Sequence, residues 1–370
     1  MKESPRIIEL DALRGVAAIG VVLWHYSGHF NSKPLAAVFG PFYANGLYLV
    51  DFFFVLSGFV LSKAYFRDSR RYRLMENIVR RSARIYPLHL FTLGLVFIGQ
   101  LILVGFLRKP SFIYRYNDFY HFVLNLALTQ SLGIQKGFSF NGPSWSVSTE
   151  FYVSILFFII LATSKKPTKA LIGLLIFSTG LFAALISSGH IRFIDPSIFR
   201  TLLGFLVGVI LFKFFSYIRR FKTWLYDLAF FFILSLLIIA ATSNSMKFNY
   251  SEFVLVILGF PLLIFSVLNG LVVPRVLRFK LFSFFGDISF SLYLIHFPVQ
   301  LYFHIAKAVG FASVNYEKPI TLIVFAIITI GLASLCYFLL ELPAQNLIND
   351  WWAERGKNVW MPNNNFSERG

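Results

Sequence analysis

Charged residues and cysteines are scarce in this sequence. Only 14% of its 370 residues are charged, and Cys336 is its single cysteine. Soluble domains carry about a quarter of their residues as charged ones, so the composition excludes an ordinary soluble protein. A lone cysteine also excludes an intrachain disulfide.

Acidic residues are the scarcer of the two charge signs. Aspartate and glutamate number 17 against 34 lysines and arginines, which gives a formal net charge of +17. In a membrane protein such an excess sets the orientation of loops, so we predict no nucleic-acid partner. The sequence has no HExxH motif and no glycine-rich phosphate loop, and we predict no metal. It also lacks an internal repeat, which disfavours a transporter built from repeated halves.

Hydrophobic residues, in contrast, make up 57% of the chain, and the mean hydropathy is +0.69. Apolar stretches of about 18 or more residues recur, long enough to cross a bilayer, and no alternating strand pattern accompanies them. We therefore predict an all-α polytopic membrane protein, a bundle of about ten transmembrane helices plus one interfacial or re-entrant helix. The predicted spans are 14–31, 46–65, 86–107, 144–163, 170–188, 198–215, 224–242, 252–271, 285–306 and 319–340.

The domain prediction is a membrane domain over 1–342 and a polar cytoplasmic tail over 343–370. The ambiguous segment is 118–133. If it does not span, both termini lie on one side, and that side holds most of the lysines and arginines. If it spans, the basic residues divide evenly between the two sides. The positive-inside rule favours the first arrangement, so we predict cytoplasmic termini in the plasma (bacterial inner) membrane.

The most informative stretch lies near the start of the chain, where Arg14 precedes His25 by eleven residues. On a helix this spacing is about three turns, so both side chains share a face about 16 Å apart. Ionisable groups at membrane depth are costly and mark functional sites. The predicted topology brings His25, Asp51 and Glu150 to one level in the outer half of the bilayer.

Glu150 lies two turns into a predicted helix whose first turn carries Trp145, Ser146 and Ser148. A capped helix with an interfacial tryptophan explains these three residues but not a carboxylate at this depth. An imidazole beside a carboxylate can take and return a proton near neutral pH. Asp51 either orients His25 or neutralises another charge.

Two further pairs of residues have more than one reading. Arg81 and Arg84, near the inner edge, either set topology and contact lipid headgroups or bind phosphates. Tyr293 and His296, one turn apart, are either a packed polar pair or part of a pocket. The Ser57–Gly58 pair favours close helix packing over a site role.

Five blocks of the sequence together resemble the acyltransferase-3 family of integral-membrane O-acyltransferases that acylate glycans and related molecules. RGVAAIGVVLWH is similar to the Arg-x10-His pattern of that family. The other four are FFFVLSGF, the basic pair before IYP, WSVSTEFY and SLYLIH. They extend from residue 9 to residue 298. The WSVSTEFY block reads Ser-Thr-Glu where Ser-Val-Glu or Ser-Leu-Glu is more usual, but the serines and the acid remain.

The resemblance implies a cytoplasmic acyl-coenzyme A donor, usually acetyl-CoA, and an acceptor hydroxyl on a glycan or glycolipid at the outer face. It implies essential roles for Arg14 and His25, donor contacts from Arg81 and Arg84, and an acid role for Glu150. Our predicted site has catalytic, donor-binding and substrate-binding residues. They are, in that order, His25, Glu150 and Asp51; Arg14, Arg81 and Arg84; and Trp145, Ser146, Ser148, Tyr293 and His296.

Two other classes stay open from the sequence. A transporter or flippase for a glycan or lipid precursor would also need polar residues inside the membrane, but would not depend on coenzyme A. A membrane-embedded sensor or scaffold would tolerate loss of His25. For the enzyme, His25 acts either as a general base or as a transiently acylated nucleophile.

Overall fold

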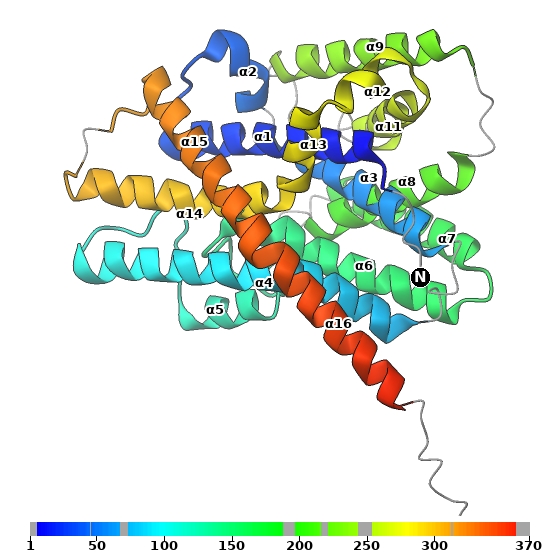
Figure 1. Ribbon diagram of the computed structural model, residues 1–370, viewed down its shortest axis with the longest axis horizontal. Helices are drawn as coiled ribbons and strands as arrows, with labels where there is room; N and C mark the ends of the chain where they lie inside the picture. Colours follow the sequence, from blue (N-terminus) through cyan, green and yellow to red (C-terminus); the bar gives the residue numbers. More distant parts are fainter. Residues whose placement is uncertain are drawn as a thin grey trace, which may run out of the picture.

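The computed structural model describes residues 6–44, 46–66, 73–187, 197–215, 221–242, 254–311 and 314–359. Within these ranges the regular elements are all helical and no strand occurs, which confirms the predicted class (Figure 1). The first half contains α1 (Ile8–Phe30), α2 (Ala36–Ala44), α3 (Gly46–Tyr65), α4 (Leu74–Gln100), η2 (Leu101–Phe106), α5 (Phe119–Leu126), η3 (Gly142–Ser144) and α6 (Trp145–Thr163). The second half contains α7 (Pro167–Ser187), α8 (Ser197–Phe215), α9 (Thr223–Thr242), η5 (Leu255–Gly259), α11 (Phe260–Asn269), α12 (Val272–Leu277), α13 (Lys280–Asp287), α14 (Ser289–Ala308), α15 (Pro319–Cys336), η6 (Tyr337–Glu341) and α16 (Leu342–Val359).

Five of the described helices are long and apolar enough to cross a membrane, and the bent pair α13–α14 makes a sixth if it counts as one span. The two members of that pair meet at an angle of 64°. Helix α1 is not among the five, because its polar side chains lower its mean hydropathy. The number of ten spans therefore stays a prediction. The five are Gly46–Tyr65, Leu74–Phe106, Gly142–Thr163, Ser197–Phe215 and Pro319–Arg355.

Helices α1 and α4 begin earlier than the sequence predicted, at Ile8 and Leu74 instead of 14 and 86. Hydropathy marks where a span becomes apolar, whereas a helix can continue through a polar first turn if its charges pair. Such pairs stabilise both starts: Arg14 lies 2.7 Å from Asp11, and Arg80 lies 3.0 Å from Glu76. The arginines predicted at the membrane edge are therefore inside helices.

The connections also differ from the prediction. The segment before α3, expected as a loop, contains helix α2. In the ambiguous segment 118–133, only Phe119–Leu126 is helical. Eight residues extend about 12 Å, well short of the roughly 30 Å hydrocarbon core, so this helix cannot cross. Beyond α15 the helix continues through η6 into α16, which packs against α4 (Figure 1). The predicted boundary at 342 thus coincides with no break in the helix.

Helices α1, α4 and α14 run across the same view in Figure 1, and α15–η6–α16 crosses them obliquely. Contacts of α14 with both α1 and α4 place it between the other two. Its buried residues Leu292 and Ile295 belong to one apolar core with Ala18 and Val21 of α1. This close packing fixes the rotation of α1 and α14 about their axes, and therefore the direction of their polar side chains.

Helices α3 and α8 form the most extensive contact, and glycines make it possible. A Cβ added to Gly58 would lie 1.9 Å from the carbonyl oxygen of Phe205, and one added to Gly208 would lie 2.0 Å from that of Val55. Small residues let helix backbones approach in this way inside bilayers. The packing role expected of the Ser57–Gly58 pair is thus confirmed for Gly58, but it is wrong for Ser57, which bonds Glu150.

Replacing Gly58 with alanine is expected to destabilise the protein by about 1–3 kcal/mol, because the two backbones must separate. Thermal unfolding of purified protein in detergent measures the loss. Gly94→Ala on α4 is the matched control, since no atom lies within 4 Å of a Cβ at that position. Equal effects of the two substitutions would contradict the packing argument.

Candidate functional site

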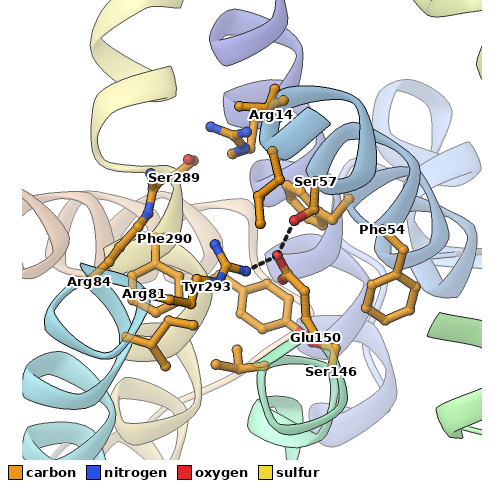
Figure 2. A pocket seen from close by; sticks show the side chains of 15 residues that line it. Arg14, Phe54, Ser57, Arg81, Arg84, Ser146, Glu150, Ser289, Phe290 and Tyr293 are labelled. Atoms are coloured by element: carbon orange, nitrogen blue, oxygen red, sulfur yellow. Dashed lines mark hydrogen bonds and ion pairs between the residues drawn. The ribbon is translucent and has the colours of Figure 1, made fainter. Parts of the chain in front are cut away.

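A polar pocket opens where five helices meet (Figure 2). All five helices, α1, α3, α4, α6 and α14, contribute polar side chains to its lining. All of them except α1 also contribute apolar side chains. The polar lining residues are Arg14, Ser57, Arg81, Arg84, Ser146, Glu150, Ser289 and Tyr293. Six of these eight were predicted as site residues, from four separate stretches of the sequence.

Three guanidinium groups face this pocket. Arg81 and Arg84 are three residues apart on α4, so they project from one face of that helix. Arg14 enters from α1 and also bonds Asp11 at 2.7 Å. Arg84 is exposed and has no ion-pair partner among the described residues. The pocket therefore carries an excess of positive charge, which suits a phosphate-bearing ligand.

Glu150 supplies the negative charge of the pocket. Its Oε1 accepts a hydrogen bond from Ser57 Oγ at 2.5 Å and forms an ion pair with Arg81 (Figure 2). Glu150 is therefore a partner of Arg81 in the pocket. These contacts do not support the prediction that Glu150 lies at the level of His25 and assists its proton transfer. The reason is the early start of α4, which carries Arg81 two turns into the helix.

Tyr293 lies between the pocket and the predicted catalytic histidine. Its hydroxyl donates to the carbonyl of Pro143 at 2.8 Å, which leaves the hydroxyl of Ser146, 2.7 Å away, as the donor to Tyr293. The ring centroid of Tyr293 is 6.0 Å from that of His296. Tyr293 thus lines the pocket with its ring and connects α14 to the start of α6.

His25 pairs with His296, with 3.0 Å between Nδ1 of His25 and Nε2 of His296. Both residues are buried. Along α1 the polar residues Arg14, His25 and His29 follow one face, and along α14 Ser289, Tyr293, His296 and Gln300 do the same. The two stripes face each other, from the arginine pocket to the histidine pair about 16 Å along the helix.

His29 continues the stripe beyond His25, and the sequence analysis left it out. Its Nδ1 donates to Oε1 of Gln300 at 2.6 Å, and its Nε2 accepts from the hydroxyl of Tyr114 at 3.5 Å. Its four-residue spacing from His25 was a usable signal, since side chains at i and i+4 share a helix face. The partners Gln300 and Tyr114 could not be found by spacing.

Asp51 does not meet His25. Both of its oxygens bond Arg200 on α8, each at 2.6 Å, and both residues are buried. The prediction that Asp51 orients His25 is therefore corrected in favour of the alternative, neutralisation of another charge. The sequence analysis missed Arg200, although an arginine near the outer end of the predicted span 198–215 was a candidate partner for a buried aspartate.

Trp145 and Ser148, predicted as substrate contacts, lie outside the pocket lining. The Trp145 ring packs against Phe54 at a centroid distance of 6.0 Å. Ser148 donates to the carbonyl of Leu128 at 2.5 Å and so fastens α6 to the loop after α5. Both residues have structural partners, and the substrate role predicted for them has no geometric support.

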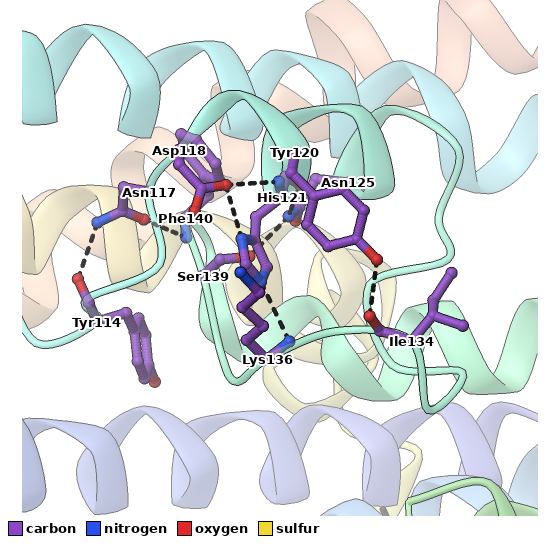
Figure 3. Close-up of polar contacts among 10 residues, drawn as sticks. All are labelled: Tyr114, Asn117, Asp118, Tyr120, His121, Asn125, Ile134, Lys136, Ser139 and Phe140. Atoms are coloured by element: carbon purple, nitrogen blue, oxygen red, sulfur yellow. Dashed lines mark hydrogen bonds and ion pairs between the residues drawn. The ribbon is translucent and has the colours of Figure 1, made fainter.

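The loop around α5 contains an imidazole–carboxylate pair (Figure 3). Nδ1 of His121 donates to Oδ1 of Asp118 at 2.7 Å, and its Nε2 accepts from the backbone N–H of Lys136 at 3.2 Å. Hydrogen bonds from the backbone and ring of His121 lower the pKa of Asp118. Both ring nitrogens of His121 are therefore hydrogen-bonded, which joins the segments on either side of α5. The segment before α5 also contains Tyr114, whose hydroxyl bonds His29.

In the described ranges, no group of three or more histidine, cysteine, aspartate or glutamate residues is arranged to hold a metal ion. The polar atoms of the pocket are guanidinium, hydroxyl and carboxylate groups. Such a set binds an anion and orients it by hydrogen bonds.

Comparison with known proteins gives one relative and one family. A curated protein of Rhizobium radiobacter, described as "Protein 2 in picA locus", is 37% identical over 105 residues, 26% of this chain and 48% of that protein. The chain thus matches about half the length of this relative. No solved structure gives a significant match.

The family model of the acyltransferase-3 proteins, described as an acyltransferase domain, matches residues 7–340. This range includes every residue of the pocket and both histidines of the pair. The match confirms the resemblance found in the sequence. The chain belongs to the acyltransferase-3 family of membrane proteins.

Proposed function

We propose that this protein is a membrane O-acyltransferase that moves an acyl group, acetyl in the first instance, from cytoplasmic acyl-CoA to a hydroxyl of a carbohydrate-containing acceptor at the outer side of the membrane. The observation that supports it best is the joining of Arg14, Arg81 and Arg84 in one pocket whose polar stripe leads to His25. A cationic pocket alone would suit any anion. The buried histidine pair, which lies on the same faces of α1 and α14 as the pocket but does not line it, favours group transfer.

The donor would bind by its phosphates at the arginine pocket. Guanidinium groups make bidentate, charge-assisted hydrogen bonds to phosphate oxygens, and Arg84 has no competing ion pair among the described residues. From there the pantetheine arm would extend along the polar stripe of α1 and α14 toward His25. The 16 Å between the levels of Arg14 and His25 suits a long, thin arm.

In the transfer step His25 takes the proton of the acceptor hydroxyl while the oxygen attacks the thioester carbonyl. A C–O bond forms, the C–S bond breaks, and the proton passes from His25 to the departing thiolate. A protonated His25 therefore exists only between the two proton transfers. In the competing version an acyl-His25 intermediate forms first and is then attacked by the hydroxyl.

Purified protein incubated with labelled acetyl-CoA tests the proposal. We expect the protein to release the coenzyme A thiol only when an acceptor is present. We also expect acyl groups on the surface glycans of cells that contain the protein and none on those of cells that lack it. A transporter or flippase would move its substrate without any coenzyme A. Absence of both thiol release and label transfer, with glycan extracts as acceptor, would overturn the proposal.

Arg84→Ala is expected to raise the Michaelis constant for the donor about tenfold, because one charge-assisted phosphate contact is lost. The constant for the acceptor should change little. Steady-state kinetics with each substrate varied in turn measures both. Arg80→Ala is the matched control: Arg80 carries the same charge on the same helix but pairs with Glu76 and does not line the pocket. An unchanged donor constant in Arg84→Ala would remove Arg84 from donor binding.

The proposed orientation has both termini in the cytoplasm and the arginine pocket toward that side. A reporter enzyme fused after Lys169, in the first turn of α7, is then expected to be active only as a cytoplasmic reporter. Activity of a periplasmic reporter at the same position would reverse the orientation.

A further inference from the structure

The histidine pair poses a question that the proposed function leaves unanswered. Nδ1 of His25 and Nε2 of His296 are 3.0 Å apart, so the two neutral rings share one hydrogen. Either His25 donates it or His296 does. Only one of these tautomers is compatible with a base at His25, because a neutral imidazole has a single unprotonated nitrogen.

If His296 donates, Nδ1 of His25 is the acceptor and the hydrogen of His25 is on Nε2. That ring then has no lone pair to offer a substrate. If His25 donates, its Nε2 is unprotonated. No hydrogen bond among the described residues engages Nε2 of His25, whereas Nδ1 faces His296, so Nε2 is the nitrogen left to face a substrate.

A carboxylate usually fixes the tautomer of a histidine base, but here both nearby candidates are committed elsewhere. Asp51 bonds Arg200 through both oxygens, and Glu150 pairs with Arg81. Three aromatic rings lie close to the His25 ring. The distances between ring centroids are 4.6 Å for Trp24, 5.0 Å for His29 and 4.9 Å for His296. Of these rings, His296 alone makes a hydrogen bond to His25 in the described structure. The backbone carbonyl of Val21, one turn earlier on α1, is a second acceptor near the His25 ring.

The far nitrogen of His296 permits the required tautomer. Its Nδ1 is buried and accepts no hydrogen bond in the described structure, and the nearby backbone carbonyls of Tyr293 and Leu292 are acceptors. No donor therefore holds this nitrogen as an acceptor, and it can carry the hydrogen while Nε2 accepts from His25.

We infer that His296 is a positioning residue whose Nε2 accepts the Nδ1 hydrogen of His25 and so makes Nε2 of His25 the proton-accepting atom. This inference rests on the proposed function. When Nε2 of His25 receives the hydroxyl proton, the bond from Nδ1 to His296 shortens and strengthens, since the donor is then charged. The proton leaves again from Nε2 to the thiolate, so His296 itself gains and loses none.

Two amide substitutions separate this role from simple packing. A glutamine at 296 can place its amide oxygen near the position of Nε2, whereas an asparagine reaches only the position of Nδ1. We expect His296→Gln to keep kcat within about tenfold of wild type. His296→Asn and His296→Leu should lose about 100-fold in kcat, within the range of general-base effects, with the donor Michaelis constant unchanged. Equal losses in the glutamine and asparagine variants, or a change confined to the Michaelis constants, would overturn the inference.

A spectroscopic measurement keeps the inference separate from the proposed function. In protein labelled with ¹⁵N-histidine, the signals of His25, assigned by their absence in His25→Ala, should show a protonated Nδ1 and an unprotonated Nε2. This pattern should be lost in His296→Leu. The opposite tautomer in wild type would overturn the positioning role even if acyl transfer were demonstrated, and failure of acyl transfer would leave the tautomer measurement interpretable.

Discussion

Replacing His25 with alanine is expected to abolish acyl transfer, with kcat lowered at least about 100-fold, while the protein stays folded. General bases contribute about 10²–10⁴-fold, and His25 is the histidine that both lies on the Arg14 face of α1 and pairs with His296. The structural cost is small by comparison, since the bond lost is a single hydrogen bond between neutral rings. Thiol release from acetyl-CoA gives the rate, and gel filtration in detergent reports folding.

A matched control comes from α14. His304 is half-buried near Phe112, outside the pocket and the histidine pair, so His304→Ala should retain wild-type kcat. Full transfer activity in His25→Ala would end the proposal for His25. A trapping experiment then distinguishes the two chemistries: with labelled acetyl-CoA and no acceptor, an acyl-enzyme pathway leaves label on His25, and a direct transfer leaves none.

The sequence was most informative where the physics is local. Helical periodicity alone placed Arg14 and His25 on one face, because that relation depends on a single helix. The residue patterns also singled out Arg81, Arg84 and Glu150, to which the resemblance then gave roles, and these do line one pocket with Arg14. The roles of these residues stay predictions. Their proximity, however, could be predicted from the sequence alone.

Partner choice between helices was not predictable in the same way. Three ionisable groups at one estimated depth suggested that His25, Asp51 and Glu150 meet, yet each has a different partner on another helix. Depth gives one coordinate, whereas contact also needs the rotation and neighbour order of the helices, which packing decides. The early starts of α1 and α4 shifted the depths further, because hydropathy does not report where a helix begins.

Asp51 offers the sharpest test of this difference between depth and contact. Asp51→Leu is expected to destabilise the protein by about 3–5 kcal/mol, because it removes the carboxylate that bonds the buried Arg200 guanidinium through both oxygens. Activity would fall as well, since α3 also carries Ser57, the hydrogen-bond donor to Glu150. Thermal unfolding in detergent, followed beside thiol release, measures both losses. The single variant cannot distinguish a structural from a catalytic aspartate.

The double variant Asp51→Leu/Arg200→Met makes that distinction. Replacing both members of a buried ion pair by apolar residues of similar size is often neutral or stabilising, so the unfolding temperature should return to near wild type. If the ion pair only joins α3 to α8, acyl transfer returns with stability. A catalytic Asp51 predicts the opposite: a stable double variant with kcat as low as that of Asp51→Leu. The contacts favour recovery of both, because each carboxylate oxygen of Asp51 is committed to Arg200 at 2.6 Å and none of its described hydrogen bonds reaches His25.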